Sequence, residues 1–117
     1  MFKEIKIGER IVPMLCKAST NVYYKQIFGK DPILLQADGN MTAGEQVIFA
    51  QQLAFVMAKA AECNGDRSKM TCLSEDDYLE WLDDLEFMDL QAALQDVMSL
   101  YAASGKSTSS GKSSSAR

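Results

Sequence analysis

Apolar residues along the chain follow the period of strands first and the period of helices afterwards. Over residues 3–17, apolar and polar positions alternate loosely around Gly8-Glu9, which predicts two short strands joined by a turn. Pro13 has no amide hydrogen to donate to a strand ladder, so its strand is expected at an edge or a bulge. We therefore expect an N-terminal β-hairpin.

The longest apolar run predicts a helix over residues 43–63 at the centre of the fold. Thr42 and Glu45 have the spacing of a capping box, and Gly65 supplies the left-handed position at which helices commonly end. The polar residues of the run are few: Gln51, Gln52, Lys59 and Glu62. A helix with so narrow a polar face belongs in the interior. Three of its side chains are expected at the centre of the core: Phe49, Leu53 and Val56.

A shorter helix is predicted between the hairpin and the central helix. Apolar residues recur at helical spacing over residues 20–28, and Gly29 ends the pattern. The connection that follows, residues 31–40, opens with Asp31-Pro32 and closes with a turn. It contains three consecutive apolar residues that are expected to lie against the core: Ile33, Leu34 and Leu35.

Two more helices are predicted in the C-terminal half. Ser74 and Asp77 form a second capping box, and apolar residues then recur every three or four positions, which predicts a helix over residues 75–85. A later apolar series is also helical but out of phase with the first. The change of phase predicts a break within residues 86–89 and a last helix over residues 88–102.

These patterns predict a mainly α (α+β) fold. In it, an N-terminal β-hairpin packs on a small bundle of about four helices around one central buried helix. A length of 117 residues suits a single core, so one globular domain is expected over residues 1–104. Residues 105–117 contain no large apolar side chain, which predicts a flexible, disordered Gly/Ser-rich C-terminal tail.

Charge, apolar pattern and cysteine content each argue against certain classes of protein. A net charge of -4 without clustered Lys or Arg argues against binding to nucleic acid. The central run is interrupted by two glutamines and Lys59, which argues against a membrane span. The three cysteines form no CxxC pair and the start of the chain resembles no signal peptide, so a reducing, cytosolic compartment is expected. Cys16 and Cys63 belong to apolar patterns and are expected to be buried rather than reactive.

Few residues suit catalysis or metal binding. The chain has no histidine, the commonest acid/base group near neutral pH and the commonest metal ligand. No catalytic, cofactor-binding or metal-binding residue is therefore expected, and the chain is not expected to be an enzyme. A dense run of acids comprises Asp76, Asp77, Glu80, Asp83, Asp84, Glu86 and Asp89. Because EF-hand spacing is missing, a solvated helix face is favoured over a calcium site, and its functional version is an acidic surface that meets a basic partner.

The aromatic residues of the first helix raise a similar choice. Tyr23, Tyr24 and Phe28 place more aromatic area on one short helix than one buried face absorbs. Either the tyrosine rings pack in the core with their hydroxyls in water, or part of this area is a docking surface. The candidate partner-binding residues are Tyr23, Tyr24, Phe28, Asp83, Asp84 and Glu86.

Residues 24–31, YKQIFGKD, follow the predicted hairpin and precede the long helix rich in small residues. Ile7-Gly8-Glu9 in the hairpin and Ala18-Ser19-Thr20 before this string complete the order of segments. This order resembles the tail assembly chaperones of long-tailed bacteriophages and their prophages, in which a Tyr-Lys/Arg-x-x-Phe-Gly-x-Asp stretch follows a short strand pair. The resemblance covers residues 5–101 and departs at Pro32, which follows the aspartate directly.

The resemblance implies a non-enzymatic role in virion morphogenesis. Chaperones of this family bind the tape measure protein, keep it soluble, and help recruit tail tube subunits before leaving the finished particle. It implies the host cytoplasm, absence from the mature virion, and a chain that is able to form oligomers. A programmed ribosomal frameshift often appends a second domain in the family, and the codons of Gly105-Lys106 and Gly111-Lys112 are compatible with a slippery site. The alternative is a generic cytosolic helical protein-binding adaptor or regulator.

Overall fold

The computed structural model describes residues 1–110, with side chains through residue 104. Two strands precede six helices in this part of the chain. The elements are β1 (Phe2–Ile7), β2 (Arg10–Leu15), α1 (Thr20–Phe28), α2 (Pro32–Asp38), α3 (Ala43–Glu62), α4 (Arg67–Met70), α5 (Glu75–Asp83) and α6 (Phe87–Ser110). The predicted fold class, an α+β fold with an N-terminal hairpin on helices, is confirmed.

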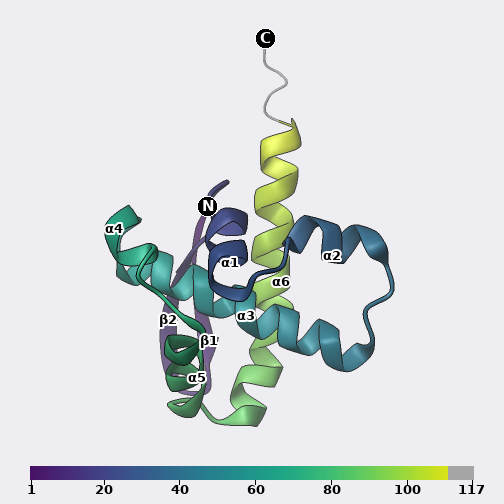
Figure 1. The fold of residues 1–117 in the computed structure, drawn as a ribbon. Coiled ribbons are helices and arrows are strands. Elements are labelled where there is room, and N and C mark those ends of the chain that lie inside the picture. The colour runs from purple at the N-terminus through teal and green to yellow at the C-terminus, as the bar shows by residue number, and fades with distance from the viewer. Residues whose placement is uncertain (111–117) are drawn as a thin grey trace.

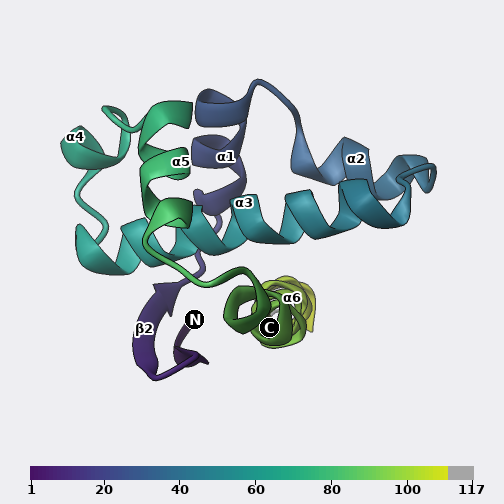
Figure 2. The same cartoon turned by 90° about the horizontal axis from the view of Figure 1, so that it is seen from below.

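α3 lies between two layers of the fold (Figures 1 and 2). The hairpin and α6 cover one side of α3, and α1 and α5 cover the other. Because neighbours lie on both sides, side chains all round the second half of the helix are buried, as its narrow polar face predicts. The buried apolar residues include Phe49, Leu53, Ala54, Phe55, Val56 and Met57.

The hairpin consists of two antiparallel strands, β1 and β2, joined by a two-residue turn at Gly8-Glu9. Ile7 lies opposite Arg10, and Gly8 has a φ of 65°. A glycine with positive φ at the first turn position gives the backbone twist that joins antiparallel strands closely. Ile5 and Ile7 point from one face of β1 into the core against α6, while β2 packs on α3. Pro13 belongs to an edge strand, as predicted, since both strands of a two-stranded sheet are edges.

Capping boxes begin both α3 and α5. The amide of Glu45 donates to Thr42 Oγ1 at 3.2 Å, and the amide of Thr42 donates to Glu45 Oε1 at 2.9 Å. The hydrogen bonds from Thr42 lower the pKa of the Glu45 carboxyl. Ser74 and Asp77 repeat the arrangement at α5. The predicted starts of both helices are therefore confirmed.

The connection before α3 differs from its prediction. Residues 32–38 form α2, in which Ile33 and Leu34 are exposed and only Leu35 packs partly against the core. Asp31 explains the helix, because its Oδ1 accepts hydrogen bonds from the amides of Ile33 at 2.9 Å and Leu34 at 3.4 Å. A helix turns consecutive residues to different faces, so the three apolar residues do not reach the core together.

The last two helices are close to their predicted positions. α5 ends at Asp83 and α6 begins at Phe87, so the break falls at residues 84–86, slightly before the predicted one. α6 continues to Ser110, past the predicted end at residue 102 and into the predicted tail. Once a helix exists, each further residue adds a hydrogen bond at little cost, and no proline interrupts this one. Residues 111–117 of the predicted tail lie outside the described residues.

Candidate partner-binding surfaces

Two of the three aromatic candidates are in the core. Tyr24 is 1% exposed and Phe28 is 9% exposed, so the structure places both rings in the core and not on a docking surface, and only Tyr23 remains half-buried. Aromatic side chains of α3 and α5 pack against these two rings of α1 and bury them. The ring of Tyr24 lies 5.5 Å from that of Phe49, and the ring of Phe28 lies 5.1 Å from that of Tyr78, both edge to face.

The buried tyrosine hydroxyls bind to the glutamines of α3. Tyr24 donates to Gln52 Oε1 at 2.5 Å, and Tyr78 donates to Gln51 Oε1 at 3.5 Å. Burial raises the pKa of Tyr24 to about 12, with smaller contributions from Tyr78 and Tyr101. Burial also raises the pKa of Tyr78 to about 12. The two glutamines, which the sequence assigned to a polar face, thus attach α1 and α5 to the central helix.

The three acidic candidates are exposed where α5 meets α6. Asp83 is the last residue of α5, Asp84 caps its C-terminal end, and Glu86 directly precedes α6. Asp84 and Glu86 line one hollow together with Asp89 and with Arg10 of the hairpin. The structure therefore brings two of the predicted acids together, but not the six candidates into one surface.

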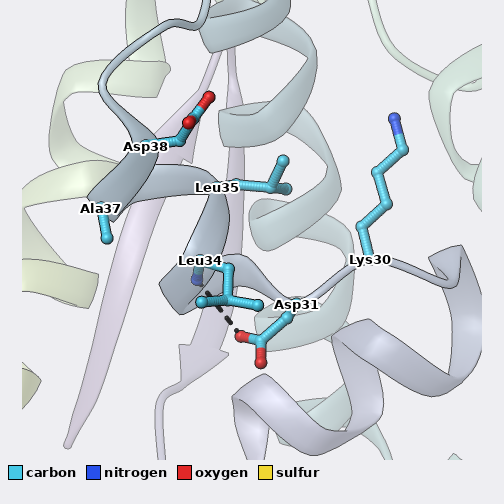
Figure 3. Close-up of a pocket in the computed structure, with 6 residues that line it drawn as sticks. All are labelled: Lys30, Asp31, Leu34, Leu35, Ala37 and Asp38. Carbon is cyan, nitrogen blue, oxygen red and sulfur yellow. Dashed lines mark hydrogen bonds between the residues drawn. The ribbon is translucent and has the colours of Figure 1, made fainter.

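The sequence prediction missed an apolar surface on α2. Leu34 and Leu35 line a hollow of about 610 Å³ together with Lys30, Asp31, Ala37 and Asp38. Figure 3 shows the hydrogen bond that joins Asp31 to the backbone of Leu34, and Lys30 and Asp38 stand apart from one another. α2 itself lies at the N-terminal end of α3, to one side of the other helices (Figure 1).

A second hollow lies between α2, α3 and α6. It has a volume of about 290 Å³, and its apolar lining comes from Leu35, Met41, Phe49 and Met98. We call the α2 site the combination of this hollow with the exposed side chains of Ile33 and Leu34. Sequence signals for α2 were present: Asp31 as the capping residue, Pro32 as the first helical residue and Gly39 after the end. Asp31-Pro32 also begins turns and connections, and the sequence pattern predicts a connection there.

The cysteines are placed differently from one another. Cys16 is buried as predicted, whereas Cys63 is half-buried because it caps the end of α3, and Cys72 is exposed. In the part of the chain that the structure describes, no group of three or more Cys, Asp or Glu side chains is placed to hold a metal ion. No helix within residues 1–110 is both long enough and apolar enough to cross a membrane.

Comparisons of this chain with protein-family models, with curated proteins and with solved structures found no match.

Proposed function

We propose that this protein is a phage tail assembly chaperone that binds the tape measure protein and keeps it soluble. The proposed site of binding is the α2 site, and the proposed ligand is the apolar face of a tape measure helix. In this proposal the protein acts in the host cytoplasm, has no enzymatic activity, helps recruit tail tube subunits through itself or a longer frameshifted form, and leaves before the virion matures.

The observation that carries this proposal is the pair of large apolar side chains that α2 exposes. Ile33 is 57% exposed and lies next to the still more exposed Leu34. Leu35 of the same helix lines the hollow between α2, α3 and α6, together with an aromatic ring and flexible methionine side chains. Methionine adapts to irregular apolar surfaces, and a helix that places apolar residues in a groove is a common mode of recognition.

The order of the N-terminal segments and the YKQIFGKD string also support the proposal, through the resemblance of the sequence to the family. A tape measure protein is a long helical chain with apolar stripes that aggregate when uncovered. Many copies of a small protein, each covering one short apolar segment through α2, would keep such a chain in solution. Each exposed apolar side chain that becomes buried contributes roughly 1.5–3 kcal/mol.

The test is co-expression of the chain with a tape measure protein from the same phage or prophage genome, followed by co-purification. Ile33→Asp is expected to weaken capture about tenfold or more, because it places a charge on the apolar face of α2. The matched control is Ile11→Asp on the hairpin. Ile11 is 56% exposed, so the two variants change the same residue type at the same exposure. Ile11→Asp should keep the binding of the parent.

Three results would count against the proposal. Equal loss in both variants would mean that α2 is not the site. Loss of the helical circular dichroism signal in Ile33→Asp alone would mean that α2 supports folding rather than binding. If the parent chain captures no tape measure protein, the generic helical adaptor becomes the better account.

A further inference from the structure

Residues 75–89 carry the densest charge of the chain. Eight of these residues are acidic and none is basic: Glu75, Asp76, Asp77, Glu80, Asp83, Asp84, Glu86 and Asp89. Among the described side chains the one ion pair joins Lys59 to Glu62, outside this segment. Arg10 lines a hollow with Asp84, Glu86 and Asp89, yet it forms no ion pair with any of them. None of these eight acids therefore forms an ion pair within the described chain.

Helix capping explains only part of this charge. The acids in the first turn of α5, and Asp89 in the first turn of α6, lie where the helix dipole favours a negative charge. Asp83 and Asp84 lie at the opposite end of α5, where the dipole disfavours them, and the last turn of that helix contains no basic residue. Helix capping and the dipole of α5 therefore do not account for these two charges.

Two large apolar side chains lie next to these acids. Phe87 and Met88, in the first turn of α6, are 63% and 70% exposed. We call the α5–α6 corner the surface formed by Asp83, Asp84, Glu86, Phe87 and Met88. Figures 1 and 2 both place the connection between α5 and α6 away from α2, so the corner and the α2 site are separate surfaces.

We infer that the α5–α6 corner docks an amphipathic helix that carries lysine or arginine beside an apolar stripe. The cations of such a partner would compensate Asp83, Asp84 and Glu86 and remove the unfavourable interaction at the end of α5. Its apolar residues would cover Phe87 and Met88. Apolar contact supplies most of the affinity in such an interface, while the charges select the partner and orient it. A chain with this corner and the α2 site binds two helical segments at once.

The experiment is an NMR titration of the full, isotope-labelled chain with designed helical peptides of roughly 18 residues, a length that allows helix formation in water. One peptide has a leucine stripe flanked by lysines, and the other has the same stripe flanked by glutamates. The lysine peptide is expected to bind more tightly and to shift the amide signals of residues 83–88. The triple variant Asp83→Asn, Asp84→Asn, Glu86→Gln is expected to weaken its binding about tenfold or more.

The charge-matched control is Glu4→Gln, Asp38→Asn, Asp96→Asn, which removes three exposed acids elsewhere. This control, and Ile33→Asp in the α2 site, should keep the parent's affinity for the lysine peptide, so the corner is tested independently of the proposed chaperone function. Replacing Phe87 and Met88 by serine should also weaken binding. The inference is overturned if both peptides bind equally, if both triple variants weaken binding equally, if the serine variant binds like the parent, or if the shifted signals belong to α2.

Discussion

At the scale of single residues, Tyr24 and Tyr78 hold neutral hydroxyls inside the protein. Their pKa values of about 12 lie above the ordinary value of 10.0, because burial disfavours the phenolate. A group whose pKa is raised by folding contributes stability below its unfolded pKa and loses that contribution as pH rises through the folded pKa. The protein should therefore be stable up to about pH 10 and lose stability between pH 10 and about 12.

The measurement is the ultraviolet absorbance of tyrosinate during a pH titration, with circular dichroism followed in parallel. The buried tyrosines should ionise late and together with unfolding. Tyr24→Phe keeps the ring but removes one hydroxyl, so one late-ionising group should disappear from the titration. Ionisation of all four tyrosines near pH 10 with an unchanged circular dichroism signal would contradict the burial of these hydroxyls.

The periodicity of apolar residues identified the centre of the core, but not every side chain that packs against it. Phe49, Leu53 and Val56 are buried as predicted, because a long run with so few polar residues has no exposed face to offer. Tyr24 and Phe28 were assigned to a possible docking surface because nothing in α1 itself shows that Phe49 and Tyr78 lie against it. Those contacts join residues far apart in the sequence, and a pattern within one helix contains no information about them.

At the scale of elements, the hairpin turn and the start of α6 are fitted to each other. A Cβ atom on Gly8 would lie closer to the carboxyl group of Asp89 than nonbonded atoms approach, so the Asp89 side chain would have to move. Gly8→Ala should cost the roughly 1–2 kcal/mol that positive φ costs a residue with a Cβ. Turning the exposed Asp89 side chain away should add a small further loss. Gly39→Ala is the comparison, since Gly39 has a φ of 70° with nothing within 4 Å of the added atom.

Denaturant unfolding of the two variants measures this difference. Adding Asp89→Ala to Gly8→Ala should recover the part of the loss that comes from the close approach. The same addition should recover nothing in Gly39→Ala. Equal stability of the two glycine variants would mean that the turn and α6 do not constrain each other.

Helices with a capping box and a long apolar pattern were predicted correctly. Short helices without such a pattern were not predicted. The capping boxes at Thr42 and Ser74 located the starts of α3 and α5 correctly. α4, with four residues, is too short for a periodic pattern, and α2 has its start signal in a dipeptide that also begins turns. The apolar part of the α2 site was missed for this reason. The acids of the α5–α6 corner, in contrast, stand in a dense run that the sequence itself shows.

At the scale of the whole molecule, α3 is the element that both layers share. Leu53 is 0% exposed, so Leu53→Asp places an unpaired charge between the layers. The cost should be several kcal/mol, comparable with the roughly 5–15 kcal/mol that stabilises a whole domain. The variant should be unfolded or insoluble. Leu34→Asp is the matched control: Leu34 is 67% exposed, and this change should leave the melting temperature near that of the parent.

Thermal unfolding followed by circular dichroism checks the pair. A cooperative transition of Leu53→Asp close to that of the parent would mean that α3 is not the shared core. If Leu34→Asp unfolds as readily as Leu53→Asp, the Leu34 side chain would have to be buried rather than exposed on α2.

The packing of β1 on α6 joins two segments that lie far apart in the sequence. Because β1 precedes α6 in the chain, Ile5 and Ile7 leave the ribosome well before the helix that helps bury them. A two-stranded hairpin alone is marginally stable in water, and pairing segments so distant in sequence is slow. Until α6 has been translated, the part of the hairpin that α6 covers therefore stays open to proteases and to the chaperones of the cell. A chain released before α6 would expose that part permanently, which would mark incomplete products for degradation.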